Sequence, residues 1–501
     1  MVNMMLSTAR LHTAASGKTT LVFWLFALTH LLFWTGLAAF VRGNLPMDSI
    51  EGSMWGQHLA LGYDKNPFLN GWLTALLNHL SHHSSWLIYF FSQLSVFFCF
   101  LAVWLLAKKM LTPAKALASV MLLEMMQYYN FHAIDFNDNT LELSLWALAI
   151  YFFYQALINP RIRWWLATGL FLALGMMAKY YTAVLIAVMF AFMLYARAAR
   201  WQFATVKPYY GLLVFLAIIA PHFLWLPTHH YITIQYALDR TNTVPDWRNH
   251  FFFPAQFIWQ QIEVFLPAAV LFGLCFFSPS RAKAQDPASD VLNRSFLLFT
   301  GLGPCVLTLL LSLCFGWDLR AGWGMPLLSL WGVLLFVYLP TTLNRKRMQW
   351  FIALTFILMG CLGTGYALSL LDSNTPSSAN FPGQTIANTV TQIWHNTYHT
   401  RLTYVAGPRW VNGNVAFYAK DHPSVYSEWN NTRAFWIDIA QLKQAGAVFL
   451  WNISNGETLP APVRVAFPTL QQTQVLTFSW QHNHHHLAPI EIGMAILPPA
   501  S

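Results

Sequence analysis

The chain has 501 residues, of which 56% are hydrophobic and only 9% charged, and its mean hydropathy is +0.44. Soluble proteins carry about 25% charged residues, so this composition excludes an ordinary soluble enzyme and indicates a membrane protein. The net charge of +9 comes from short basic clusters between apolar runs. That pattern reflects membrane topology and argues against a nucleic-acid-binding surface.

Eleven apolar runs approach the length of about 20 residues that a membrane-spanning helix needs. They lie at 21–41, 86–107, 113–130, 140–158, 163–178, 180–199, 208–226, 262–278, 295–315, 322–340 and 350–371. The segment 163–199 is divided because one helix would be about 55 Å long, too long for a hydrocarbon core of about 30 Å. Basic residues flank both of its ends, so the chain is expected to turn near Lys179.

Charged residues between these runs predict how the helices cross the membrane. Sixteen Lys and Arg residues fall in segments assigned to the cytoplasm and six in the opposite loops. This bias places the N-terminus inside and the C-terminus outside. Most acidic residues of the membrane part lie on the outer side, although acids contribute little to topology. We therefore expect a functional site that faces outward.

After about residue 372 the composition becomes more polar. Residues 374–380 have the composition of a linker. The sequence beyond them predicts a helix at 437–445 and strands at 402–406, 415–418, 447–451, 475–478 and 490–497. About 120 residues suffice for a small α/β domain. We therefore predict a polytopic α-helical membrane domain at 1–371 and a C-terminal α/β domain outside the membrane at 372–501.

The outer loop after the first apolar run carries Asp48 and Glu51, three residues apart. On a helix these carboxylates would share one face, where they could bind a divalent cation or one could accept a proton. The same spacing also suits a capping box, with Asp48 as the N-cap residue of a short helix and Glu51 three positions later. The spacing leaves both interpretations open.

A second acidic group lies at the outer ends of the third and fourth predicted helices. It consists of His132, Asp135, Asp138 and Glu142, whose spacings would align them on one helical face. Like charges packed together are costly unless a cation or a substrate compensates them. One of these acids could cap a helix, but capping does not account for all three, so a functional role is favoured.

Cations on the outer side complement these acids. They are Lys65, Lys179, Arg240 and Arg320, with His222 near the end of the run at 208–226. Ionisable groups at membrane depth indicate function by default, and Lys and Arg are suited to binding a phosphate. Each one singly could also be a side chain that extends to the membrane surface.

Several motifs resemble a known family. The run Asp48-x-x-Glu51-x-x-x-Trp55-Gly56-Gln57, followed by Leu61-Gly62-Tyr63 and Pro67, resembles the first outer loop of GT-C glycosyltransferases of family 39, the protein O-mannosyltransferase and aminoarabinose transferase type. Asp138 with Leu141 and Trp146 resembles that family's second acidic loop. Five further motifs resemble those of the family's bacterial branch: Lys179-Tyr180-Tyr181, Pro221-His222, Tyr236-Ala237 with Arg240, Tyr404-Val405-Ala406-Gly407 and Trp436-Ile437-Asp438.

The resemblance implies transfer of a sugar from a polyprenyl-phosphate carrier to an acceptor outside the cytoplasmic membrane. It implies that Asp48 is the base or the group that orients the acceptor, and that Asp138 is its partner from the second loop. This chain departs from the family at two places. It has Asp48-Ser49 where the family often has Asp-Glu, which leaves Glu51 as the second acid. It has Asn66-Pro67-Phe68 where the family often has His-Pro-Pro, which leaves Lys65 as a candidate for the role of that histidine.

We therefore predict an inverting, lipid-phosphate-sugar-dependent glycosyltransferase of the cytoplasmic (inner) membrane. Its acids would be Asp48, Glu51 and Asp138, and its donor phosphate would be bound by Lys65, Lys179, His222, Arg240 and Arg320. Asp48 and Asp138 are also the candidate ligands of a divalent metal cation. The expected partners are the lipid-linked donor, an extracytoplasmic lipid, glycan or protein acceptor, and membrane lipids.

Two alternatives come from other classes of protein. A transporter or flippase for a lipid-linked or anionic solute would hold its charged residues near the membrane midplane, on broken helices and often within repeated halves. Here the charged residues gather at outer loops, and the sequence has no internal repeat. A scaffold without catalysis would not require paired acids in two separate loops.

Overall fold

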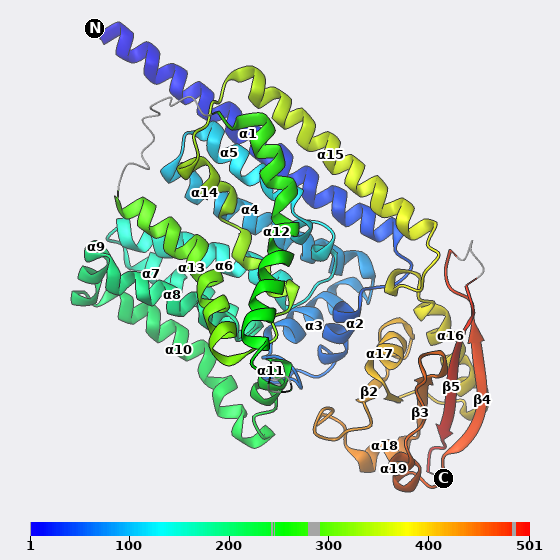
Figure 1. Cartoon of the computed structure of the whole chain (residues 1–501). Coiled ribbons are helices and arrows are strands. Elements are labelled where there is room, and N and C mark those ends of the chain that lie inside the picture. Colours follow the sequence, from blue (N-terminus) through cyan, green and yellow to red (C-terminus); the bar gives the residue numbers. More distant parts are fainter. Residues whose placement is uncertain (1, 242–243, 245, 279–290, 483–486, 501) are drawn as a thin grey trace.

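The computed structural model describes residues 2–241, 244, 246–278, 291–482 and 487–500. The chain up to α15 forms a bundle of long helices, and a smaller part with a five-stranded sheet lies at one end of that bundle (Figure 1). The predicted class, a polytopic helical membrane protein with a small C-terminal sheet, is confirmed. The charged loop residues predicted within 281–290 lie outside the described residues.

Seven helices of the described residues are long and apolar enough to cross a membrane. They are α1 (Val2–Val41), α4 (Ser85–Met110), α6 (Asp138–Ile158), α10 (Lys207–Trp225), α12 (Asn249–Phe276), α13 (Val291–Phe315) and α15 (Arg345–Leu371).

Two further spans would be bent. α8 (Thr182–Tyr195) meets the segment Arg197–Ala204 at 99°, and Ala321–Leu328 meets α14 (Trp331–Tyr338) at 52°. By length and composition the described residues therefore hold seven to nine spans rather than the eleven predicted. The predicted turn near Lys179 is confirmed, because the apolar helix α7 (Ile162–Ala178) ends there and α8 follows.

The apolar run at 113–130 does not form the single helix that its composition predicts. It folds into α5 (Pro113–Met121) and the short 3₁₀ helices η1 (Leu122–Met125) and η2 (Gln127–Tyr129). The break occurs around Glu124, whose buried carboxylate needs partners inside the bundle. His30 Nδ1 of α1 lies 2.5 Å from one oxygen of this carboxylate, and Trp34 Nε1 donates to the other at 2.9 Å.

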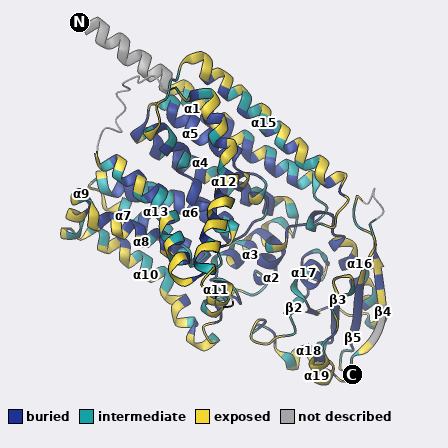
Figure 2. Cartoon of the chain, viewed as in Figure 1, coloured by how far each residue is buried: buried dark blue, intermediate teal, exposed yellow. Residues whose placement is uncertain are grey.

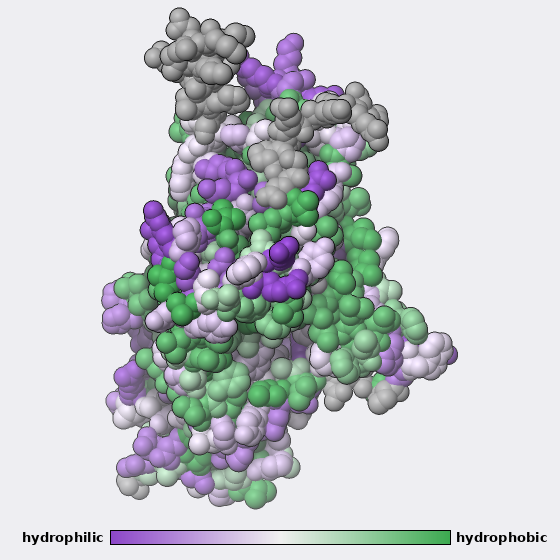
Figure 3. All heavy atoms as spheres, turned by 90° about the vertical axis from the view of Figure 1, so that its left-hand side faces the viewer, coloured by the Kyte–Doolittle hydropathy of each residue, from purple (hydrophilic) through white to green (hydrophobic). Residues whose placement is uncertain are grey.

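The helices at the periphery of the bundle have the surface of a membrane protein. Figure 2 shows broad exposed faces on α10, α12 and α15, whereas α4 and α6 are largely buried. Large apolar side chains such as Leu212, Leu213 and Leu224 are exposed on α10. On the face seen in Figure 3, hydrophobic residues form broad areas, and hydrophilic residues gather in separate clusters between them. Such a surface suits lipid rather than water.

The C-terminal part begins with α16 (Gly383–Tyr398) and contains a mixed sheet of strand order β2-β1-β3-β5-β4. Parallel neighbours are β2 (Ser424–Ser427), β1 (Tyr404–Gly407) and β3 (Ala447–Asn452); β5 (Ile490–Leu497) and β4 (Gln471–Phe478) follow in antiparallel pairing. Three helices lie between strands, α17 (Arg409–Tyr418), α18 (Ile439–Ala445) and α19 (Ala461–Ala466). The carboxyl ends of the three parallel strands therefore meet at one edge of the sheet.

The predicted strand at 415–418 is wrong, because these residues form the last turn of α17 and the strand is β2. Val411 and Val415 are fully buried and one helical turn apart, so the apolar period here is that of a helix. The helix predicted at 437–445 and the other four strands are confirmed.

α17 packs on α2 (Met47–Trp55), the short helix of the first outer loop. Val411 and Val415 belong to the same apolar cluster as Met54 and Trp55. A Cβ atom at Gly413 would lie only 2.8 Å from Ile50 Cγ2, so glycine permits this close approach. The contact fixes the C-terminal part directly beside the residues predicted to form the site.

Candidate active site

Helix α2 presents Asp48 and Glu51 from its first two turns. Its N-cap residue is Pro46 and no side chain caps it, so the capping-box interpretation of the pair is wrong. Asp48 Oδ2 instead accepts a hydrogen bond from Asn137 Nδ2 of the second outer loop at 3.0 Å. Burial raises the pKa of Asp48, and the neighbouring Glu51 raises it further.

The second outer loop does not align its four predicted residues on one helical face. His132 lies in the 3₁₀ helix η3 (His132–Ile134), and α6 begins only at Asp138. Asn137 caps α6 by accepting from the backbone N–H of Thr140 at 3.0 Å, so no acid is needed as the cap. Only Asp138 and Glu142 therefore share a helix.

Asp135 joins the two outer loops. Its Oδ1 accepts hydrogen bonds from the backbone N–H and the hydroxyl of Ser49, at 3.0 and 2.8 Å. Burial and the charge of Asp48 raise the pKa of Asp135 to about 7. These two bonds tie together the loops that carry Asp48 and Asp138.

A cavity of about 520 Å³ opens between these loops and α8, α11 (Ile232–Thr241) and α13. Seven of the eight predicted site residues line it: Asp48, Glu51, Asp138, Lys65, Lys179, Arg240 and Arg320. Lys65 and Lys179 are partly buried, whereas Arg240 and Arg320 are exposed. The cavity thus has acids and two cations inside and two arginines where it is open to solvent.

The predicted residue His222 does not line this cavity. It is fully buried; its Nδ1 lies 2.6 Å from the carbonyl oxygen of Leu61, and its Nε2 lies 2.5 Å from the hydroxyl of Tyr180. Tyr180 itself lines the cavity. A Cβ atom at Gly62 would lie 3.0 Å from His222 Cε1, so the loop passes close over this histidine. His222 therefore supports the loop that carries Lys65 and does not itself line the cavity.

The acids of the cavity differ in their partners. Asn66 Nδ2 donates to Asp138 Oδ2 at 2.5 Å, whereas Asp138 Oδ1 is buried and has no hydrogen-bond partner among the described residues. Glu51 is paired with Lys65, whose Nζ lies 2.7 Å from its Oε1. Asp138 Oδ1 is therefore an acceptor that a ligand hydroxyl could use.

Lys179 contributes its charge from the turn between α7 and α8. Its ammonium donates to the side-chain oxygen of Asn139, the second residue of α6, and lies 5.5 Å from the centre of the Trp323 ring. These contacts fix the ammonium beside Asp138 without a direct ion pair between the two residues. The positive charge therefore faces the cavity.

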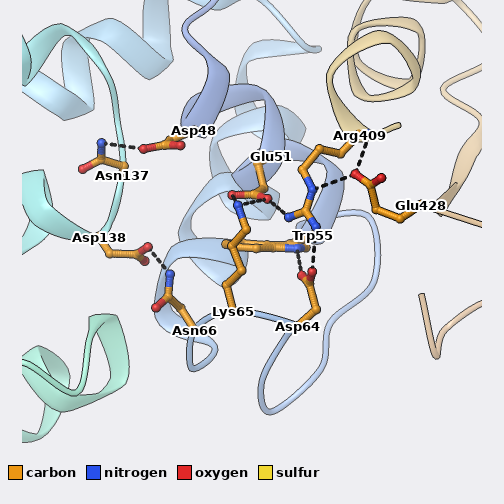
Figure 4. A network of polar contacts seen from close by, with 10 residues as sticks. All are labelled: Asp48, Glu51, Trp55, Asp64, Lys65, Asn66, Asn137, Asp138, Arg409 and Glu428. Carbon is orange, nitrogen blue, oxygen red and sulfur yellow. Dashed lines mark hydrogen bonds and ion pairs between the residues drawn. The ribbon is translucent and has the colours of Figure 1, made fainter. Parts of the chain in front are cut away.

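Arg409, the first residue of α17, was not among the site residues predicted from the sequence. Figure 4 shows its guanidinium reaching from the C-terminal part toward the first outer loop. It is paired with Glu51, with Asp64 Oδ2 at 3.0 Å and with Glu428 Oε1 at 3.2 Å. Burial lowers the pKa of Arg409, but the charges of Glu51 and Asp64 outweigh this effect and hold it above its usual value.

Two features of the fold draw attention to Arg409. A basic residue in the first turn of a helix is unfavourable for the helix dipole, so acidic partners favour it there. Arg409 also lies two residues beyond the end of the parallel strand β1, at the edge of the sheet where such folds place functional residues. Neither feature identifies which acids it would meet.

The described residues contain no group of three or more His, Cys, Asp or Glu side chains placed to hold a metal ion. Asp48 and Asp138 line the same cavity but supply two ligands, and Lys179 provides a positive charge beside them. The metal site at these two residues therefore remains a prediction.

Two solved structures share this architecture. ArnT from Cupriavidus metallidurans bound to undecaprenyl phosphate matches with a TM-score of 0.61 at 15% identity, over 95% of this chain and 97% of that chain. The apo form matches with a TM-score of 0.60 at 13% identity, over 96% and 98%. The chain therefore has the GT-C fold.

Comparisons with known sequences indicate which proteins of this fold the chain resembles. The family model described as dolichyl-phosphate-mannose-protein mannosyltransferase matches residues 65–225. The lipopolysaccharide core galacturonosyltransferase RgtB of Rhizobium johnstonii is 26% identical over 228 residues, and this match spans 44% of each chain, less than half the length of that relative. The resemblance to GT-C proteins of the mannosyltransferase and aminoarabinose transferase type is thus confirmed.

Proposed function

We propose that this protein transfers a sugar from a polyprenyl-phosphate-linked donor to an acceptor at the outer face of the cytoplasmic membrane, with inversion at the sugar. The observation that carries the proposal is the cavity in which Asp48 and Asp138 lie together with Lys65, Lys179, Arg240 and Arg320. Transfer to a hydroxyl acceptor needs both a group that accepts a proton and cations that stabilise a departing phosphate.

In the proposed reaction an acceptor hydroxyl attacks the anomeric carbon of the donor. Asp48 takes the hydroxyl proton as the new carbon–oxygen bond forms. The bond between the anomeric carbon and the phosphate oxygen breaks, and the polyprenyl phosphate leaves with the electron pair. Lys65 and Lys179 stabilise its charge inside the cavity, and Arg240 and Arg320 attract it at the entrance.

The other cavity residues have supporting roles in this scheme. Asp138 orients the acceptor or the sugar through its unpaired Oδ1. Glu51 sets the position of Lys65 through the ion pair between them. If the acceptor is itself a phosphate, no base is required, and Asp48 would orient it or hold a divalent cation together with Asp138.

The comparisons support this proposal at the level of the donor. The related structure of ArnT contains undecaprenyl phosphate, and the matching family is described by a dolichyl-phosphate sugar. The relative RgtB acts on the lipopolysaccharide core, which favours a glycan or lipid of the cell envelope as the acceptor. In this arrangement residues 1–371 form the catalytic membrane domain, with the N-terminus in the cytoplasm, and residues 372–501 form an extracytoplasmic domain.

The test uses purified protein in lipid, a radiolabelled polyprenyl-phosphate sugar pool and a membrane extract as acceptor. Asp48→Asn and Asp138→Asn are compared with wild type and with Asp246→Asn, a matched change of an exposed outer aspartate that does not line the cavity. We expect transfer to fall by about 10²-fold or more in the two cavity variants and to persist in the control. Wild-type protein that transfers no label, but carries the intact lipid-linked sugar across the bilayer, would contradict the proposal and favour a flippase.

A further inference from the structure

A second cavity, of about 380 Å³, lies in the C-terminal part at the carboxyl ends of the parallel strands. It is lined by Pro408, Arg409, Trp410, Glu428, Trp429, Glu457 and Thr458. Arg409 and Glu428 follow β1 and β2, whose last residues pair with each other, and Glu457 follows β3. Open sheets of this kind bind ligands in the crevice beyond the carboxyl ends of their strands.

Arg409 connects this second cavity with the first. It lines the second cavity, and its guanidinium is paired with Glu51, which lines the first. The same guanidinium is paired with Glu428, so the two cavities share one ionic network (Figure 4). A ligand that touches Glu428 therefore lies two ion pairs away from Glu51, which holds Lys65 in the first cavity.

The charged residues that line the second cavity indicate which kind of ligand it can bind. Arg409 is the only cation among its lining residues, and three carboxylates already share that charge. Burial raises the pKa of Glu457, and the nearby Glu428 adds to this effect, whereas a hydrogen bond from the Asn452 backbone opposes it. Glu428 and Glu457 make the lining acidic, which disfavours phosphates and carboxylates.

One of the two indole rings of the cavity, Trp429, is held in a fixed turn. Glu428 and Trp429 both have left-handed backbone, with φ of 55° and 51°, which is uncommon for residues other than glycine. The turn is held by Arg409, whose backbone N–H donates to Glu428 Oε1 at 3.2 Å, and by the Tyr426 hydroxyl, which donates to the Trp429 carbonyl at 3.0 Å. The indole N–H of Trp429 is buried and has no acceptor among the described residues.

We propose that this second cavity is the subsite that binds an uncharged sugar ring of the acceptor glycan. A sugar ring offers C–H faces that pack on indole rings, hydroxyl groups that donate to carboxylates, and oxygens that accept from an indole N–H. The cavity supplies indole rings in Trp410 and Trp429 and carboxylates in Glu428 and Glu457, and the buried indole N–H of Trp429 is left without an acceptor among the described residues. The inference rests on the proposed transfer reaction and identifies which part of the acceptor the C-terminal domain recognises.

The test begins with binding to the full-length protein in detergent, measured by saturation-transfer NMR. The probes are maltose and lactose, with glucuronic acid as the negatively charged counterpart. We expect signals from the neutral sugars and none from glucuronic acid. Glu457→Gln and Trp429→Ala should weaken the signals, whereas Glu491→Gln, an exposed glutamate of β5, should not. Equal signals in wild type and Glu457→Gln, or no signal in wild type, would overturn the inference.

Kinetics separate this inference from the proposed function. If wild type transfers sugar, Glu457→Gln should raise the acceptor KM for a neutral glycan by about tenfold, which corresponds to one lost charge-assisted hydrogen bond. The loss should fall on KM rather than on kcat and should disappear with an acceptor that lacks the sugar ring. An unchanged acceptor KM would refute the subsite and leave the transferase intact, whereas a wild type without transfer but with sugar binding would refute the transferase alone.

Discussion

The guanidinium of Arg409 binds the carboxylate of Glu51, 358 residues earlier in the chain. The pair links the C-terminal part to the first outer loop, and Glu51 in turn is paired with Lys65 inside the cavity. Asp64 shares the same guanidinium and also accepts from Trp55 Nε1 at 3.1 Å. The C-terminal part is therefore a structural component of the proposed active site.

Removal of Arg409 should destabilise the protein as a whole. In Arg409→Gln, Glu51 and Asp64 would remain buried without their shared cation, at a cost of about 3 kcal/mol. Arg409→Lys should recover only part of this loss, because one ammonium cannot replace a planar guanidinium that binds three carboxylates. The thermal unfolding midpoint in detergent measures the effect. The control Arg401→Gln, which changes an exposed arginine of the same domain, should have little effect, and equal shifts in both variants would contradict the assigned role.

Lys179 should matter for chemistry more than for folding. Lys179→Met would remove a charge that stabilises the departing phosphate, so kcat should fall by about 10²-fold. The thermal unfolding midpoint of this variant should stay near that of wild type, because the main contacts of Lys179 are the side-chain amide of Asn139 and the ring of Trp323. Lys420→Met, a change of an exposed lysine outside the cavity, should retain full activity. A kcat for Lys179→Met close to that of wild type would remove this lysine from the mechanism.

The pH dependence of transfer should report Asp48. Because burial and Glu51 raise its pKa, the rate should fall on acidification at a higher pH than for an ordinary aspartate. Asn137→Ser keeps a cap for α6 but removes the amide that donates to Asp48, so the fall in rate on acidification should shift to still higher pH. Glu51→Gln removes a negative neighbour and should shift this fall to lower pH. Shifts in the same direction in the two variants would show that the fall in rate reports another group.

Asp135 should make folding stability depend on pH. Its pKa is raised from 3.8 to about 7, so its stabilising contribution is complete below pH 3.8 and is lost as the pH rises toward 7. The full loss amounts to at most about 4 kcal/mol. Asp135→Asn keeps an oxygen that accepts from Ser49 and cannot ionise, so its unfolding midpoint should vary less between pH 5 and pH 8. An equally steep dependence in this variant would assign the effect to another residue.

The sequence predicted the membrane class, most helices and seven of the residues that line the cavity, because acids and cations at the outer ends of apolar runs are visible without a structure. It could not predict the break at Glu124, since that break depends on His30 and Trp34 of a distant helix. It also mistook the end of α17 for a strand, because four apolar or aromatic residues are too short to distinguish the two periods. Arg409 was missed because two of its acids, Glu51 and Asp64, lie 358 and 345 residues earlier in the chain and only the tertiary fold brings them to it.

The most direct test of the proposed function follows both products of one turnover. Purified wild-type protein in lipid is incubated with the polyprenyl-phosphate sugar pool and acceptor, and mass spectrometry measures free polyprenyl phosphate while NMR determines the anomeric configuration of the product. We expect one polyprenyl phosphate released for each sugar transferred, with inverted configuration, and about 10²-fold less of both products from Asp48→Asn. A lipid-linked sugar that stays intact and reaches the opposite leaflet, with no polyprenyl phosphate released, would show that the protein is not a transferase.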